Sequence, residues 1–277
     1  MDLLTIISGL NQGLSFFDKI KNIGKAFKII REKEKVDYIV LDAKKQVTVL
    51  GNGHGIIICS FEIYVVNPEK FKFFYRKTNI EDAAINSNFP SLAEMQKCNI
   101  NERFEKFGFW FECDNNCIEE VEEFYWKDDD FEGEDQNSKA NPRELKYRFK
   151  MNTNNMERGK TYKLVYSISI PGMYPLKDYK FDKSLLAKNA QSQSKSAMRI
   201  THYVRKLTYT VSFEKEILFT APPCGEIFCP TRDMSNGDKN HKPLESRNIS
   251  DIFYKRYQYI TKNPSFHSKI IIKWQFK

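Results

Sequence analysis

A glycine-rich run around His54, GNGHG, is the first stretch whose composition could serve a ligand. Such runs cradle phosphate when they open a helix, because the backbone N–H groups and the helix dipole then point at the anion. Here the run leads into IIICSFEIYVV, whose β-branched and aromatic residues are typical of a strand. We therefore expect a hairpin turn with His54 facing solvent. A place at the mouth of a ligand site is the alternative.

The stretch DDDFEG, residues 128–133, matches the first half of a calcium-binding loop, in which alternate oxygens wrap the ion before a glycine turns the chain. The twelfth position of such a loop needs a bidentate acid, and Lys139 stands there. We therefore expect a solvated acidic loop. An irregular divalent-ion site, or a patch that meets a partner or a basic part of the same chain, are the alternatives.

The cysteines and histidines do not follow the spacing of a metal or catalytic site. Three residues separate Cys113 from Cys117 and four separate Cys224 from Cys229, whereas a zinc knuckle needs a tighter loop. The chain also lacks the GxSxG, HExxH and P-loop motifs. We therefore expect free thiols, no metal, no cofactor and no catalytic residue, so the sequence indicates a protein that is not an enzyme.

Basic residues alternate with apolar ones along several stretches of the carboxyl-terminal half. If they lie on one face of a sheet, they can contact the phosphates of a nucleic acid. The simpler alternative is the solvated outer face of a sheet. The candidates for phosphate contact are Lys146, Arg148, Lys163 and Arg205.

Charge is distributed unevenly along the 277 residues. The formal net charge is +8, yet residues 118–135 hold ten acidic side chains and one lysine, a local net charge of −9. By subtraction, the remainder of the chain carries +17. A basic remainder can bind nucleic acid, anionic lipid or an acidic partner, or it can face the acidic segment of its own chain.

Residues 1–35 are predicted to form one long amphipathic helix. Apolar residues recur every three or four positions from Leu3 to Ile30, and most lysines lie off that stripe. Such a helix packs on a sheet or against a second copy; alternatively, it lies on an anionic membrane with its lysines at the headgroups. The residues expected to contact a partner or membrane are Phe16, Phe17, Lys19, Ile20, Ile23, Phe27 and Lys28.

Residues 36–277 are predicted to form an antiparallel β-sandwich, so the fold class is mainly β. Runs of alternating apolar residues recur there with short turns and few helices. Residues 36–66 are predicted to contain three strands. A polar turn at residues 43–45 separates the first two, and the glycine-rich turn precedes the third.

Further along, residues 145–151 and 162–170 both alternate, and we expect them to pair as a hairpin. Between the two predicted hairpins, residues 118–140 form an acidic insertion. Near the carboxyl end we expect a short helix at residues 249–261 and a last strand at residues 269–276.

The stretches VDYIVLD, IIICSFEIYVV and KIIIKWQFK resemble β-rich domains of bacterial defence-associated proteins whose biochemical role is mostly undescribed. The resemblance implies a β-rich fold and an accessory or sensor-effector role. It assigns no functional residue, because the shared stretches contain no polar site motif.

These observations favour a non-enzymatic binding module, an accessory or effector protein of a bacterial antiviral defence system, that docks or oligomerises through residues 1–35. One alternative is a membrane-surface or membrane-disrupting effector that acts through the same helix. The other is nucleic-acid binding by a basic sheet face. Without a secretory leader or a run of about 18 apolar residues, the expected location is the cytoplasm, with a peripheral membrane location as the alternative.

Overall fold

The computed structural model describes residues 36–80, 82–123, 144–174, 194–228, 241–266 and 268–277. Internal contacts divide the chain into Met1–Asp37 and Tyr38–Lys277, and every described helix and strand belongs to the second unit. The helix predicted for residues 1–35, with all seven residues expected to contact a partner or membrane, lies outside the described residues. So do residues 124–140 of the acidic insertion.

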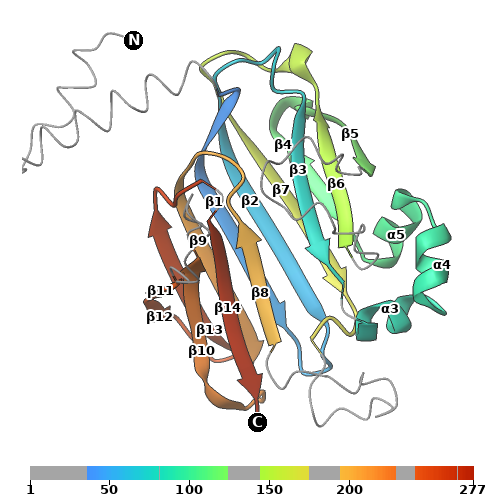
Figure 1. Cartoon of the computed structure of the whole chain (residues 1–277), viewed down its shortest axis with the longest axis vertical. Coiled ribbons are helices and arrows are strands. Elements are labelled where there is room, and N and C mark those ends of the chain that lie inside the picture. The colour runs from blue at the N-terminus through green and yellow to red at the C-terminus, as the bar shows by residue number, and fades with distance from the viewer. Residues whose placement is uncertain (1–35, 81, 124–143, 175–193, 229–240, 267) are drawn as a thin grey trace, which may run out of the picture. The chain divides into compact units, whose positions relative to one another are not determined.

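The prediction of a mainly β protein is confirmed, and the described strands form three sheets (Figure 1). The largest has seven strands in the order β12-β13-β9-β1-β2-β7-β4. Its pairs are antiparallel except β1 with β9, which run parallel. Its strands are β1 (Tyr38–Val49), β2 (Gly55–Val65), β4 (Trp110–Cys113), β7 (Thr161–Ile170), β9 (Val204–Glu214), β12 (Ser246–Asn248) and β13 (Tyr254–Lys262).

Two smaller sheets accompany it, with strand orders β11-β10-β14-β8 and β3-β6-β5. The strands of the first are β8 (Ser194–Arg199), β10 (Phe219–Phe228), β11 (His241–Leu244) and β14 (Lys269–Phe276). Those of the second are β3 (Phe73–Asn79), β5 (Ile118–Glu123) and β6 (Glu144–Met151). The described helices are α3 (Asp82–Asn88), α4 (Leu92–Lys97) and α5 (Ile100–Lys106), with the 3₁₀ turns η1 (Asp114–Asn116) and η3 (Thr153–Asn155).

Both smaller sheets pack on the same face of the large sheet. The three-stranded sheet contacts it through aromatic rings: Phe74 of β3 lies 5.1 Å from Phe61 of β2. The four-stranded sheet contacts it through Trp274 of β14, which lies 5.3 Å from Phe213 of β9. Because successive side chains of a strand point to opposite faces, every second residue of β2 is buried in this interface.

The turn predicted at residues 43–45 is wrong, because β1 continues through it. The register with β2 runs without a break from Asp42 opposite Glu62 to Val49 opposite Gly55. Asp42 and Lys44 point to the face opposite the small sheets and form a 3.3 Å ion pair. The polar composition of this stretch reflects that face and not a reversal of the chain. The glycine-rich turn between β1 and β2 is confirmed, with Gly53 at φ 76°.

The short helix predicted at residues 249–261 is also wrong, because β13 occupies residues 254–262 and pairs with β9. Tyr259 is 1% exposed, and its hydroxyl donates to the carbonyl oxygen of Pro223. Cross-strand pairing and burial of this ring outweigh a helical spacing of apolar residues that local sequence alone favours. The last strand, predicted at residues 269–276, is confirmed as β14.

The hairpin predicted for residues 145–151 and 162–170 has the right strands and the wrong partners. β6 pairs with β3 and β5, whereas β7 pairs with β2 and β4. Thus the two strands belong to different sheets. No described helix is long and apolar enough to cross a membrane.

Trp274→Ala should lower the free energy of unfolding by about 3–5 kcal/mol, because it leaves a large cavity where the four-stranded sheet meets the large one. The matched control is Trp110→Ala, since Trp110 is 51% exposed and Trp274 only 2%. We expect that change to cost less than about 1 kcal/mol. Urea unfolding of both variants measures the difference, and equal losses would contradict the packing described.

Candidate anion-binding cleft

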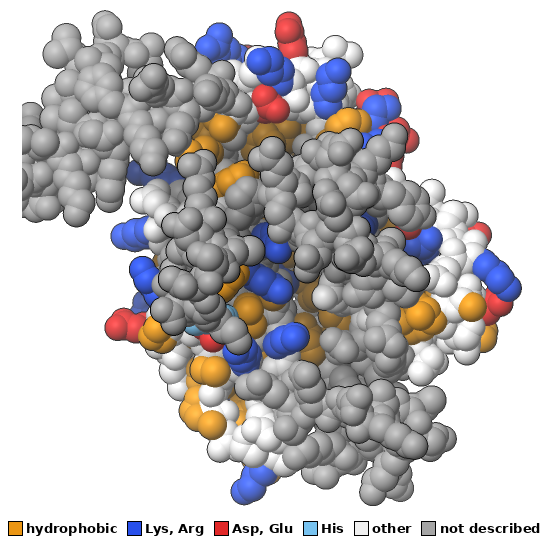
Figure 2. Space-filling view, viewed as in Figure 1, with side chains coloured by type: hydrophobic (Ala, Val, Ile, Leu, Met, Phe, Trp, Pro, Cys, Tyr) orange, Lys and Arg blue, Asp and Glu red, His pale blue; other side chains and the backbone are white. Residues whose placement is uncertain are grey.

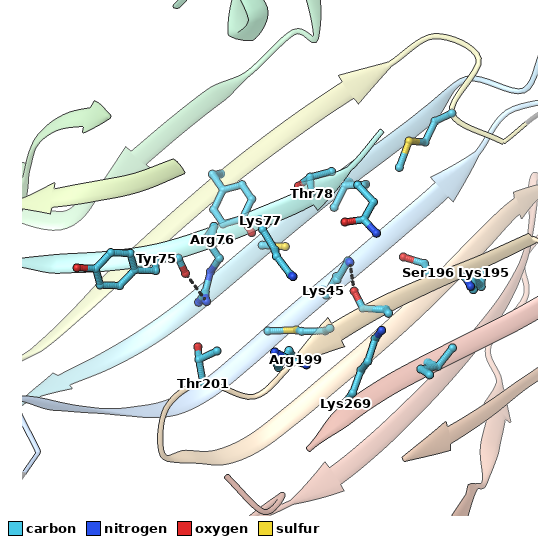
Figure 3. Close-up of a pocket in the computed structure, with 18 of the residues that line it drawn as sticks. Lys45, Tyr75, Arg76, Lys77, Thr78, Lys195, Ser196, Arg199, Thr201 and Lys269 are labelled. Carbon is cyan, nitrogen blue, oxygen red and sulfur yellow. Dashed lines mark hydrogen bonds between the residues drawn. The ribbon is translucent and has the colours of Figure 1, made fainter. Parts of the chain in front are cut away.

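A cleft of about 320 Å³ lies between β3 of the three-stranded sheet and β8 of the four-stranded sheet (Figure 3). Its floor comes from β1, β2 and β7 of the large sheet, through side chains such as Lys45, Cys59 and Tyr166. Its sides are residues 75–79 of β3 and residues 195–199 of β8. The cleft exists because two separate sheets share one face and their edge strands do not join.

The described lining of the cleft is strongly basic. It contains no Asp or Glu, and Lys and Arg side chains are visible near the middle of this face (Figure 2). A cleft lined by one sign of charge raises the local concentration of ions of the opposite sign. The six cationic residues are Lys45, Arg76, Lys77, Lys195, Arg199 and Lys269.

Arg76 reaches from β3 over the aromatic floor. Its guanidinium carbon lies 4.1 Å from the centre of the Phe61 ring and 3.8 Å from that of Phe74. One terminal nitrogen donates to the carbonyl oxygen of Tyr75 at 3.0 Å, while the Nε atom is buried without a hydrogen-bond partner. Among the described residues, the partners of this cation are therefore a carbonyl and two rings, and none is a carboxylate.

Lys45 is the second cation of the floor and comes from the centre of β1. Its Nζ donates to the carbonyl oxygen of Ala197 in β8 at 2.8 Å and lies 5.3 Å from the centre of the Tyr209 ring. Tyr209 is opposite Lys45 in the parallel register of β1 and β9, so both side chains point to the same face. No described carboxylate neutralises Lys45 either. Among the described residues, the floor thus carries two half-buried positive charges and no negative one.

The other ionisable groups of the floor favour their neutral forms. Burial raises the pKa of the Cys59 thiol, and the charges of Lys45 and Arg76 oppose this shift without reversing it. Burial also raises the pKa of Tyr166 well above its usual value. A neutral thiol and a neutral phenol at physiological pH leave the cations as the charge of the floor.

His202 borders the floor beside Arg76. Burial lowers the pKa of this imidazole well below its usual value, and the charge of Arg76 lowers it further. Its Nδ1 lies 2.7 Å from the hydroxyl of Tyr38, and its ring stacks on Phe74 at 5.5 Å. His202 is therefore neutral at physiological pH and adds no charge to the cleft.

The residues predicted to contact phosphate are not brought together. Lys146 and Arg148 lie on β6, Lys163 on β7 of the large sheet and Arg205 on β9. Arg148 forms a 2.6 Å ion pair with Glu122 of β5. These residues lie on strands of two sheets, and none of them lines the cleft.

Part of the acidic segment does face a basic part of its own chain, as one of the alternatives proposed. Glu119 and Glu120 of β5 form ion pairs of 3.1 and 3.0 Å with Lys150 of β6. Glu123 makes a 2.7 Å ion pair with Arg103 of α5. Residues 128–133, the candidate calcium half-loop, lie outside the described residues.

The remaining candidates do not assemble into one site. His54 lies in the turn after β1, where Nε2 is 2.7 Å from the Ser169 hydroxyl, so it faces β7 and not solvent alone. Cys113 and Cys117 are neighbours, and the Cys113 sulfur accepts from the backbone N–H of Ile118. In the described part of the chain, no three His, Cys, Asp or Glu side chains are grouped to hold a metal ion.

Sequence reasoning missed the cleft, although β1 and β3 carry a signal for it. Lys45 is in phase with the buried residues Ala43 and Val47, and Arg76 is in phase with the buried Phe74. A cation at an inward-facing position of a strand is unusual, because burial of an unpaired charge is costly. The turn predicted at residues 43–45 concealed that phase.

The described residues form a mainly β protein with a basic cleft, and the described lining of this cleft contains no Asp or Glu. No family model matches the chain, and no curated protein matches it. One similar solved structure is a protein from Parabacteroides distasonis with a provisional description as a protease; identity is 12%, coverage 86% of this chain and the TM-score 0.47. The chain spans 40% of that protein's length.

A second structure, the Fcho1 Mu homology domain of Danio rerio with a bound Eps15 peptide, matches at 11% identity and a TM-score of 0.12. The alignment covers 86% of this chain and 79% of that domain. With both TM-scores below 0.5, neither likeness supports a transfer of fold or activity.

Stability should fall as the pH is lowered, because His202 resists protonation in the folded protein. Its folded-state pKa is depressed, so the unfolded chain binds more protons below about pH 6.5, and the stability present above that pH is lost as the pH falls. Between pH 7.5 and pH 5.5 this group alone should cost about 1.4 kcal/mol. Urea unfolding at both pH values should show a smaller loss for His202→Gln. Identical losses in the two proteins would contradict the assignment.

Proposed function

We propose that this protein is a non-enzymatic binding module that holds an anionic ligand in the cleft between β3 and β8. One observation carries the proposal: Lys45 and Arg76 place two half-buried cations on the cleft floor, and no described carboxylate neutralises them. The charges are held by carbonyl oxygens and aromatic rings, which orient a cation without cancelling it.

The energetics favour an anion at this place. A ring contact with a desolvated cation contributes about 2 kcal/mol, whereas removing an ion fully from water costs several kcal/mol. Half-burial makes the cost smaller than that, and we expect the carbonyl oxygens and rings to offset only part of it, so that an anion would stabilise both cations further. The buried Nε of Arg76 and the buried hydroxyl of Thr201, both in the lining, are polar atoms that a ligand would also satisfy.

A binding role also suits the neutral groups of the floor. The thiol of Cys59 has a raised pKa, so it is not activated as a nucleophile, and the nearby imidazole of His202 is too buried to serve as a base at neutral pH. Arrangement and charge thus support recognition of an anion without supporting its chemical conversion.

A docking or oligomerising role for residues 1–35 is the second part of the proposal. The division of internal contacts between Met1–Asp37 and Tyr38–Lys277 supports it, because the second unit holds its own core. In this proposal the cleft binds the ligand, and residues 1–35 dock on a partner or on a second copy of the chain. Two such separate contacts are expected of an accessory or effector protein.

Arg76→Gln and Lys45→Gln should each weaken the binding of a polyanion about ten- to hundredfold, because each removes a charge-assisted hydrogen bond from a partly buried site. The probes are a fluorescein-labelled oligoglutamate and a fluorescein-labelled oligothymidylate of equal charge, measured by fluorescence anisotropy. Binding should weaken as salt rises. The proposal fails if the unaltered protein binds neither probe.

The matched controls are Lys163→Gln and Arg205→Gln, which remove cations predicted from sequence to contact phosphate but absent from the cleft lining. We expect both to bind like the unaltered protein. If instead these two variants lose binding and Arg76→Gln does not, the ligand site lies outside the cleft. A thermal unfolding curve for each variant separates loss of binding from loss of fold.

Deletion of residues 1–35 should leave a folded β unit that binds the polyanion with unchanged affinity and no longer self-associates. Circular dichroism, anisotropy and light scattering of the full chain and of residues 36–277 test the three parts. A truncated chain that fails to fold would show that residues 1–35 belong to the core. Equal masses for both chains would remove the oligomerising role.

A further inference from the structure

The cleft has a strand edge on each side. Among the described residues, β3 has a strand partner only in β6, and β8 has one only in β14. Figure 3 shows the two edges on either side of the cleft, with Lys45 between them. A strand edge presents backbone N–H and C=O groups that can pair with another extended chain.

The direction of the backbone groups of β8 follows from its hydrogen bonds. Ile200, one residue past the strand, donates its N–H to the carbonyl oxygen of Ser268. Because hydrogen-bonded pairs alternate along an antiparallel pair of strands, the backbone N–H and C=O groups at the even-numbered positions of β8 point at β14. The carbonyl of Ala197 instead accepts from Lys45 on the cleft floor. The N–H and C=O groups of Lys195 and Ala197 therefore point into the cleft.

β3 has the complementary arrangement. Met151 of β6 donates its N–H to the carbonyl oxygen of Lys72, one residue before β3. The backbone N–H and C=O groups at the even-numbered positions of β3 therefore point at β6. The carbonyl of Tyr75, which accepts from the Arg76 guanidinium, faces the cleft. Both sides of the cleft thus present main-chain groups in the direction in which a strand would pair.

We propose that the anionic ligand is an extended acidic peptide that adds to the cleft side of β8 as a new strand. This inference rests on the proposed anion-binding function and names its ligand class. The contacting stretch, residues 195–199, is about 16 Å long at roughly 3.3 Å per residue, enough for about five residues of the peptide. The Ala197 carbonyl oxygen has a second lone pair for a peptide N–H.

Charge placement suits an acidic strand. Side chains of an added strand alternate between the floor and the opposite side. Those that point down reach Lys45 and Arg76. Those that point up meet Lys195, because Ser196 points at the large sheet and accepts from the Tyr209 hydroxyl, so its neighbours point away. Carboxylates at both sets of positions would meet cations.

The free edge of β8 in the described chain distinguishes a peptide ligand from a nucleic acid. Main-chain pairing gives a peptide affinity that does not depend on its side chains, and alternate pockets add selectivity. A nucleic acid would use the same cations without the N–H and C=O groups of β8. Lysines on these edges can also serve only to block sheet-to-sheet aggregation, in which case no peptide pairs there.

The test compares the oligoglutamate with its ester-linked counterpart, in which each backbone N–H is replaced by oxygen while charge and spacing stay the same. Losing two or three N–H···O bonds to the edge of β8 should weaken binding about tenfold or more. Anisotropy titrations of the full chain give both affinities. Equal affinity for the amide and ester forms overturns the strand addition and leaves the anion-binding cleft standing.

A substitution in β8 tests the same strand addition by changing the protein instead of the peptide. Ala197→Pro removes an N–H that points into the cleft and not at β14, and an edge strand accepts proline at such a position. We expect an unchanged unfolding curve and an affinity for the oligoglutamate at least about tenfold weaker, with oligothymidylate unaffected. Unchanged peptide binding by a folded Ala197→Pro variant, or oligothymidylate binding as tight as the peptide, contradicts the inference. If the unaltered protein binds neither probe, the proposed anion-binding function fails as well.

Discussion

Two separate small sheets share one face of the large sheet, and the rest of the β unit depends on that division. A single covering sheet would close the face completely, and β1 and β2 would need apolar residues along their whole inner side. Because β3 and β8 are edges that do not pair with each other, neither small sheet covers the strip of floor between them. Lys45 lies in that strip, whereas Val47 and Val49, further along the same side of β1, are fully buried.

The described ion pairs are distributed unevenly between the three-stranded sheet and the cleft. On the three-stranded sheet, acidic residues of β5 form ion pairs with basic residues of β6: Glu122 pairs with Arg148, and Glu119 and Glu120 pair with Lys150. The neighbouring strand β3 contributes Arg76 to the cleft with rings and a carbonyl as its partners. Among the described residues, carboxylates thus neutralise Arg148 and Lys150 on β6, whereas Arg76 on β3 has no carboxylate partner.

Local sequence predicted where several single strands lie, but it did not predict which strands pair with each other. The alternation in residues 269–276 predicted β14 with its bounds, because an alternating pattern depends on neighbours in sequence. The strands at residues 145–151 and 162–170 were found as well. Their assignment to different sheets could not be predicted, since pairing is settled by contacts between distant segments.

The same dependence on distant partners explains why the candidate site was not predicted. The cations of β6 stand out because Lys146, Arg148 and Lys150 alternate with apolar residues, but alternation alone does not tell which face is covered. Lys45 and Arg76 are single residues in otherwise ordinary strands, and only the fold places them together. What could be seen is their phase with buried neighbours, Val47 for Lys45 and Phe74 for Arg76.

Rigidity and recognition are linked in this arrangement. The floor cations are positioned before any ligand binds: Lys45 by the Ala197 carbonyl and the Tyr209 ring, and Arg76 by Phe61 and Phe74. A ligand therefore does not have to immobilise two flexible side chains, a cost of about 0.5–1.5 kcal/mol for each. Because Lys45 also donates to the Ala197 carbonyl of β8, the charge proposed to attract an anion is joined directly to the main chain with which an extended ligand would pair.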